Sequence, residues 1–204
     1  MSEIEELEDK VSKLKAKLKK AKELSPTRGI ETMFRITSKS HMELSAIADN
    51  KANIMISINS IMLSVIVSVL IRKLEEYPHF TIPAILLTLV CLATIVFAVL
   101  ATRPNVSSGK FEKEDIVGKK TNLLFFGNFH RMSLEDYQWG MTEMLKDADY
   151  LYGSMIKDIY FLGVVLGKKY RLLRYSYTVF MFGFVLAILG FVIAQFMFRN
   201  MSAY

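Results

Sequence analysis

Residues 41–64 read HMELSAIADNKANIMISINSIMLS and join a charged, amide-rich segment directly to an apolar one. The chain has no Pro or Gly from Ile30 to Leu70, so no residue in this stretch is expected to stop a helix. Residues 54–71 contain no charged side chain and are long enough for a short membrane span. One helix is therefore predicted to carry a polar motif segment, residues 30–53, and the first span, residues 54–71.

Two more uncharged runs are long enough to cross a membrane, residues 82–101 and residues 175–198. A short polar loop separates the first two runs, which predicts a transmembrane hairpin. The polar segment 102–174 separates the second run from the third. With 52% hydrophobic and 23% charged residues, the chain is expected to lie partly in a membrane and partly in water. The predicted fold class is an all-α membrane protein with three transmembrane helices, a small, mainly helical cytoplasmic domain and a short N-terminal coiled coil.

The distribution of Lys and Arg sets the expected orientation. With three spans, residues 1–53 and residues 102–174 lie on one side, and they hold 23 of the 26 Lys and Arg residues. Basic residues favour the cytoplasmic side of a membrane. We therefore expect a multi-pass protein of the cell inner membrane, with a cytoplasmic N-terminus and a periplasmic C-terminus. The basic residues before the third span also suit contact with anionic lipid; they are Lys168, Lys169, Arg171 and Arg174.

The N-terminal segment, residues 1–24, carries a heptad pattern over three repeats. Its apolar positions are Ile4, Leu7, Val11, Leu14, Leu18 and Ala21. The pattern predicts a short coiled coil through which the protein forms homo-oligomers, and a solvated helix that packs on its own protein remains the alternative. Residues 25–29 include Pro26 and Gly29 and are predicted to be a linker, with the next helix beginning near Ile30.

The predicted cytoplasmic domain has two parts. Residues 106–130 have mixed character, and a small hairpin and an irregular loop both fit them. Ser133 and Asp136 have the spacing of a helix capping box. Apolar residues then recur every three or four positions, which predicts an amphipathic helix leading into the third span, with Gly163 and Gly167 as the candidate breaks.

Two of the predicted spans carry patterned faces. At about 100° per residue, the first span has a polar stripe on one arc of its helix. The stripe continues from Asn53 through Ser57, Ser60, Ser64 and Ser68. Two interpretations remain open: these side chains pack helices together, or they line a water-filled path once several chains assemble. The third span has a face of small residues that favours helix packing, namely Gly183, Ala187, Gly190 and Ala194.

Polar side chains are concentrated where the first span is expected to meet water. They are His41, Glu43, Asp49, Asn50, Lys51 and Asn53. Asp49 and Asn53 are one helical turn apart, so both can face one ligand or the cytoplasmic domain. A satisfied polar network at the membrane interface remains the alternative.

The aromatic run FFGNF at residues 125–129 has three open interpretations. Phe125 and Phe126 form the core of the small domain, dip into the membrane surface, or stack on a nucleobase. Stacking on a base would need a phosphate-binding partner, for which the candidates are Arg131, Lys119 and Lys120.

The sequence has no motif of a known catalytic site: no Gly-rich phosphate loop, HExxH, GxSxG or CxxC. The single cysteine, Cys91, lies in an apolar run, and the three histidines have no neighbours at metal-ligand spacing. We therefore expect no catalytic residues, no metal site, no nucleic-acid partner and no enzymatic activity.

Three segments read HMELSAIADNKANIMISINSIMLS, NLLFFGNFHRMSLEDY and DIYFLGVVLGKKYRLLRYSYTVFMFG. Together they resemble the transmembrane effector family of bacterial Pycsar antiphage systems. The likeness covers about residues 33–195, and its most specific part is ADNKAN, residues 48–53. The residues that match the family's motif are Asp49, Asn50, Lys51 and Asn53, with weaker matches at Phe125, Phe126, Gly127, Tyr137, Asp158 and Tyr170.

This resemblance implies a function. Such effectors are encoded beside a pyrimidine nucleotide cyclase, and the likeness implies that cyclic CMP (cCMP) or cyclic UMP (cUMP), made during phage infection, triggers membrane impairment and growth arrest. It implies a signalling ligand but no cofactor. Our hypothesis is that the ligand binds between residues 41–53 and residues 102–174. The alternative function is a non-enzymatic anchor or scaffold that recruits a soluble partner through its heptads.

Overall fold

The computed structural model describes residues 8, 10–17, 26–104, 116, 118 and 122–201. The chain divides into two units, residues 1–40 and residues 41–204, which are described separately. Within the described residues all regular structure is helical and no strand occurs. The predicted all-α class is therefore confirmed.

The first unit contains the helical residues 10–17 and the start of helix α2 (Pro26–Val65). α2 begins at Pro26 rather than near Ile30, so the prediction that residues 26–29 form a linker was wrong. Proline is well tolerated in the first turn of a helix, because the N–H group that it lacks would have no intrahelical partner there. Pro26 thus starts this helix.

Two of the six heptad positions, Val11 and Leu14, belong to the described residues. Their side chains are 47% and 59% exposed. The other four lie outside the described residues: Ile4, Leu7, Leu18 and Ala21. An exposed apolar pair on one helix face is what a coiled coil requires of each chain. The coiled coil itself stays a prediction.

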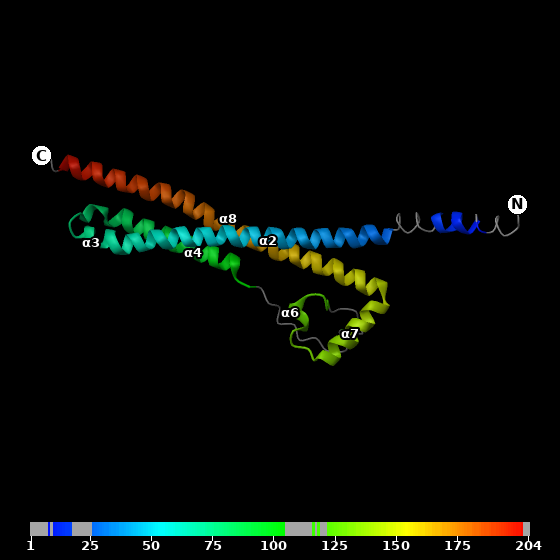
Figure 1. Ribbon diagram of the computed structural model, residues 1–204. Coiled ribbons are helices and arrows are strands. Elements are labelled where there is room, and N and C mark those ends of the chain that lie inside the picture. The colour runs from blue at the N-terminus through cyan, green and yellow to red at the C-terminus, as the bar shows by residue number, and fades with distance from the viewer. Residues whose placement is uncertain are drawn as a thin grey trace. The chain divides into compact units, whose positions relative to one another are not determined.

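Three helices in the described part of the chain are long and apolar enough to cross a membrane (Figure 1). The first is α2, which continues through a π-helical turn, η1 (Ile66–Leu70), into the short α3 (Ile71–Leu74). A 3-10 turn, η2 (Pro78–Phe80), then leads into α4 (Thr81–Thr102). The third is α8 (Ala148–Met201). The three predicted spans are confirmed as candidate membrane-spanning helices.

The three helices of the second unit pack through small side chains. One cluster joins α2, α4 and α8 and consists of Ala48, Ala52, Met55, Ala98, Ala101 and Leu173. A second cluster joins η1, α4 and α8 and consists of Ile66, Leu87, Cys91 and Ala187. Small side chains let helix backbones approach closely, which is how helices associate in a membrane where hydrophobic exclusion from water is absent. One buried hydrogen bond crosses this interior, from Ser176 Oγ to the Thr94 carbonyl at 2.9 Å.

The small residues of α8 lie against α4. A Cβ atom at Gly183 would overlap the Val90 side chain, and one at Gly190 would come within 3.2 Å of Pro83 Cβ. Between these glycines Ala187 is fully buried. This face therefore permits the close approach of two helices of the same chain.

A small domain, here called the α6–α7 domain, contains α6 (Phe126–Phe129) and α7 (Leu134–Lys146). Its core consists of Ile116, Leu123, Met144 and Tyr150. Ser133 Oγ accepts a hydrogen bond from the Asp136 N–H at 3.1 Å, which makes Ser133 the N-cap of α7, at the start that the sequence predicted. Of the ambiguous segment 106–130, residues 106–115, 117 and 119–121 lie outside the described residues, and residues 122–130 form turns and α6.

The break before α8 falls at Asp147, so the expectation of a break at Gly163 or Gly167 was wrong. Asp147 has extended backbone angles, φ −122° and ψ 104°, and its Oδ1 accepts a hydrogen bond from the Tyr150 N–H at 3.0 Å. Asp147 therefore caps the start of α8. A glycine costs a helix only about 1 kcal/mol relative to alanine. The helix accordingly continues through both glycines for 54 residues.

We expect Gly183→Ala to lower the free energy of unfolding by about 1–3 kcal/mol, because the added methyl group meets Val90 in a packed interface. Thermal or denaturant unfolding of the protein in detergent measures this. Gly167→Ala is the matched control, since a Cβ at Gly167 meets no atom within 4 Å; it should leave stability unchanged or raise it by up to about 1 kcal/mol. Equal effects of the two substitutions would contradict the assigned packing.

Candidate functional site

Residues 41–52 of α2 and residues 163–173 of α8 run side by side in the same direction. We call this contact the α2–α8 junction. It begins at His41, whose ring lies 3.7 Å from the position that a Cβ at Gly163 would take. One to two turns further on, the Tyr170 hydroxyl donates to the Leu44 carbonyl at 3.3 Å. The junction ends in the cluster formed by Ala48, Ala52 and Leu173. It thus brings His41 and Tyr170, two of the predicted site residues, into one contact region.

An ion pair lies at the centre of the α2–α8 junction. Lys169 Nζ donates to both carboxylate oxygens of Asp49 at 2.8 Å and to Ser45 Oγ at 2.9 Å. The side chains are 16% exposed for Lys169 and 38% for Asp49. Because an ammonium group has three protons, all three donors of Lys169 are directed to α2. Residues 120 positions apart in the chain are thereby joined by one charged contact.

The sequence interpretation identified Asp49 but missed its partner. Lys169 was assigned to lipid contact along with the neighbouring basic residues, and Ser45 was not selected. A positional signal was present: Asp49 lies five residues before the first predicted span, and Lys169 lies six residues before the third. Parallel helices that enter a membrane together bring such residues to the same depth. The similar distances of the two residues from their spans were the clue to this pair.

The rest of the ADNKAN motif faces away from α8. Asn50, Lys51 and Asn53 are exposed, whereas Ala48 and Ala52 are buried. The motif therefore has two faces: Asp49 and the alanines hold α2 to the other helices, and the amides and Lys51 are accessible from outside.

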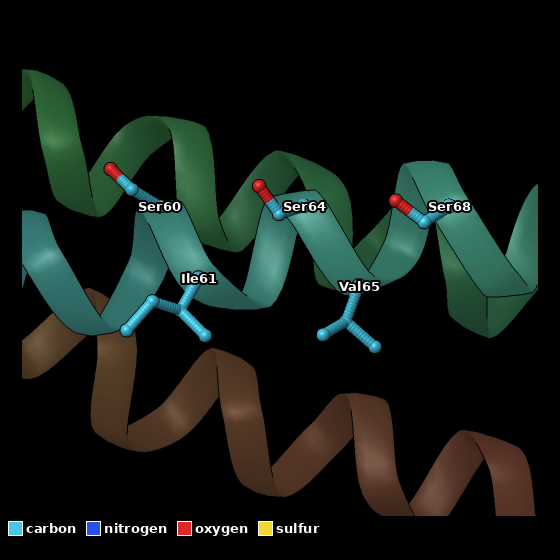
Figure 2. Close-up of a pocket in the computed structure, with 5 residues that line it drawn as sticks. All are labelled: Ser60, Ile61, Ser64, Val65 and Ser68. Atoms are coloured by element: carbon cyan, nitrogen blue, oxygen red, sulfur yellow. The ribbon is translucent and has the colours of Figure 1, made fainter.

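The serine stripe continues this outer face. Ser57, Ser60, Ser64 and Ser68 are all exposed. Figure 2 shows Ser60 and Ser64 of α2 and Ser68 of η1 along one edge of this continuous helix, with Ile61 and Val65 on an adjacent edge. These five residues line a shallow surface groove. In the single chain, the four serines of the stripe are therefore not buried against α4 or α8.

The α6–α7 domain is joined to α8 through Asn122. The Asn122 amide donates to Asp158 Oδ1 at 3.3 Å, and its own oxygen accepts from the Leu124 N–H at 3.0 Å. Asn128 in α6 donates to the Asn122 carbonyl at 2.8 Å. Asp158, a predicted site residue, therefore holds the turn that precedes FFGNF. Burial raises the pKa of its carboxyl group, and the hydrogen bond from Asn122 opposes this rise.

The aromatic residues of this domain are divided between core and surface. Phe125 is partly buried and packs against the exposed Phe126, with ring centroids 5.0 Å apart. Tyr137 packs on the domain core and on Phe129 at 4.6 Å. Arg131 is exposed, and Lys119 and Lys120 lie outside the described residues. The domain is thus separate from the α2–α8 junction, and the structure does not bring these aromatic residues to Asp49.

No group of three His, Cys, Asp or Glu side chains in the described part of the chain is arranged to hold a metal ion. At the α2–α8 junction, the Lys169 ammonium donates to the Asp49 carboxylate and the Ser45 hydroxyl, and the Tyr170 hydroxyl donates to a backbone carbonyl. This arrangement suits an ion pair that holds two helices together and that another ion can weaken or strengthen.

The chain was compared with known proteins. A model of the Pycsar effector protein domain matches residues 32–194, which is about four fifths of the chain. The protein belongs to the Pycsar effector family. No curated protein and no solved structure matches it. Membership of this family indicates that the protein is an antiphage membrane effector, and the matched region of this Pycsar effector includes the α2–α8 junction, the stripe and the α6–α7 domain.

We expect Asp49→Lys and Lys169→Asp each to destabilise this Pycsar effector, because each puts two like charges at the junction. Combining them should restore part of the loss, with a coupling energy of about 1–3 kcal/mol. A double-mutant cycle on the thermal midpoint in detergent measures this coupling. The matched pair Asp149→Lys and Lys157→Asp exchanges two exposed charges of α8 and should show a coupling below about 0.5 kcal/mol. Strictly additive effects of the two junction substitutions would rule out a significant ion pair.

Asp158 gives a pH-dependent prediction. A carboxyl group whose pKa is raised by folding stabilises the fold below its unfolded pKa, and this contribution is lost as the pH rises through the folded pKa. Asp158→Asn keeps the acceptor for Asn122 but never ionises. We expect the variant to be more stable than the wild type near neutral pH, with a difference that shrinks toward about pH 4. Thermal unfolding across this range measures it, with the exposed Asp149→Asn as control; a difference independent of pH would disprove the role of ionisation.

Proposed function

We propose that this protein is an effector that cCMP or cUMP, made by a partner cyclase, activates to impair the inner membrane and stop the growth of infected cells. The observation that carries the proposal is the division of α2 into two faces. Asp49 of the ADNKAN motif ties the inner face to α8, while the exposed stripe begins at Asn53 on the outer face of the same helix. Family membership supplies the antiphage setting.

The proposed mechanism begins with a resting state in which the ion pair between Asp49 and Lys169 holds α2 against α8. A ligand changes this equilibrium only if it binds the activated arrangement more tightly than the resting one. Binding near residues 41–53 weakens the hold of α8 on α2. Because α2 is one helix from Pro26 to Val65, a rotation or displacement at the junction reaches the serine stripe. With the N-terminus in the cytoplasm, as the distribution of Lys and Arg predicts, the α6–α7 domain also lies in the cytoplasm.

Homo-oligomers form part of the proposal. The exposed face of a membrane span contacts lipid or another chain, and hydroxyl groups gain more from polar partners or water than from hydrocarbon. The stripe is therefore expected to contact the stripes of neighbouring copies, assembled with help from the heptads. The exposed Val11 and Leu14 equally suit the alternative function, in which the heptads recruit a soluble partner and the spans serve as an anchor.

Substitutions of the stripe distinguish the roles of the serines. We expect Ser57, Ser60 and Ser64 replaced together by Leu to abolish cyclase-dependent dye uptake and growth arrest, because bulky apolar groups block both close helix approach and hydration. Replacement of the same three by Ala removes the hydroxyl groups but keeps the side chains small. Loss of activity in the Ala variant indicates a water-lined path, whereas retained activity indicates helix packing.

The control for the stripe lies on another exposed face. Ile82, Ile85 and Leu89 of α4 are exposed, and their replacement by Val should leave dye uptake and growth arrest unchanged. Expression with and without an active cyclase, scored by uptake of a membrane-impermeant dye, tests the function itself. Absence of cyclase-dependent leakage in the wild type would refute the effector mechanism. A pure anchor would instead show no cyclase-dependent leakage and would keep its soluble partner in the Leu variant.

A further inference from the structure

A basic cavity lies beside the α2–α8 junction, between the end of α4 and α8. It has a volume of about 380 Å³ and is lined by Leu100, Ala101, Arg103, Pro104, Lys168, Lys169 and Leu172. Three of these residues are cationic and none is acidic. The volume falls within the range of pockets that bind small molecules.

The charges of this cavity favour an anion. Arg103 and Lys168 are exposed, and in the part of the chain that the structure describes neither forms an ion pair. The last carbonyl groups of α4 carry partial negative charge, which the Arg103 N–H partly offsets by donating to the Val99 carbonyl at 3.0 Å. Three full positive charges outweigh this partial charge. A guanidinium group can present two N–H groups to two oxygens of one anion.

The lining also has an apolar part. Leu100, Ala101 and Leu172 form a wall next to the cations. An anion that carries an organic group therefore fits the cavity better than a small inorganic ion, because its uncharged part can cover this wall. The cavity adjoins the ends of two candidate spans, at the depth where phosphate groups of a membrane are expected.

Lys169 belongs to both the cavity and the junction. Its three donors are directed to Asp49 and Ser45 on α2. An anion that takes a hydrogen bond from this ammonium group must displace at least one of those contacts, since no fourth proton exists. Binding of an anion in the cavity therefore weakens the attachment of α2 to α8.

We infer that this cavity binds a phosphodiester monoanion, which competes with Asp49 for Lys169 and so loosens α2 from α8. For a soluble source, a cyclic pyrimidine nucleotide, the inference rests on the proposed function. A phosphatidylglycerol headgroup offers the same chemistry: one negative charge shared by two oxygens that accept hydrogen bonds. Both sources reach the same three cations, and experiment separates them.

The test uses the full-length protein in phosphatidylcholine nanodiscs, with cCMP and cUMP titrated by calorimetry, and in parallel nanodiscs that contain phosphatidylglycerol, with bound lipid counted by native mass spectrometry. The cavity variant R103Q/K168Q removes two exposed cations and should weaken binding by at least about tenfold. The control variant R171Q/R174Q removes the same charge from exposed positions of α8 outside the cavity and should change binding by less than about threefold.

A third variant tests the competition. Asp49→Asn frees Lys169 from its counter-charge and should tighten binding about three- to tenfold, because coupling between two binding events is reciprocal. Tighter binding cannot result from misfolding. Equal binding by the cavity and control variants, or no binding of either phosphodiester by the wild type, overturns the inference. Unchanged affinity of Asp49→Asn overturns the competition.

The outcomes separate this inference from the proposed function. Loss of nucleotide binding in the cavity variant assigns the cavity to the nucleotide, and selective loss of phosphatidylglycerol assigns it to lipid. If a cyclase triggers growth arrest equally in the wild type and in the cavity variant, the cavity is not the ligand site although the effector function stands. If the wild type does not respond to the cyclase but loses phosphatidylglycerol through R103Q/K168Q, the proposed function fails and the phosphodiester site remains.

Discussion

The ammonium group of Lys169 fixes how α2 and α8 lie against each other. A charge close to hydrocarbon is costly without a partner, so pairing of Asp49 with Lys169 favours the arrangement in which the two helices lie together. Once they meet, the register of two parallel helices is set, and the next turns bring Ala48, Ala52 and Leu173 into one cluster. The packing of α2 against α8 therefore includes a polar contact next to its apolar cluster.

The contact between Asp49 and Lys169 also determines which side of α2 stays exposed. The inner side carries Asp49, Ala52 and Met55, and the outer side carries Asn53 and the serines. Under the proposed function, this polar outer side contacts neighbouring copies, because lipid offers no polar partner for its hydroxyl groups. In that proposal, α2 links the contact with α8 inside one chain to contacts between chains.

The fold could be predicted from the sequence wherever one local property was sufficient. Uncharged runs of membrane length located the three candidate spans, and Ser133 with Asp136 located the start of α7. The prediction was wrong at Pro26, which lies in the first turn of α2, and at Gly163 and Gly167, through which α8 continues. The partner of Asp49 could not be chosen by composition, because four basic residues precede the third span and only packing turns Lys169 inward. The basic cavity could not be predicted from the sequence for a related reason, because its residues come from two segments more than sixty positions apart.

The unbroken α8 has a consequence for how this protein can vary in length. Successive residues of a helix are rotated by about 100°, so inserting one residue between Asp158 and Lys169 would turn the ammonium group away from α2. The α6–α7 domain would stay attached to Asp158 through Asn122. A loop would absorb such an insertion, but a continuous helix passes it on as a rotation. The separation of Asp158 and Lys169 is therefore constrained to whole helical turns. The length of α8 between them sets the spacing between the α6–α7 domain and the membrane.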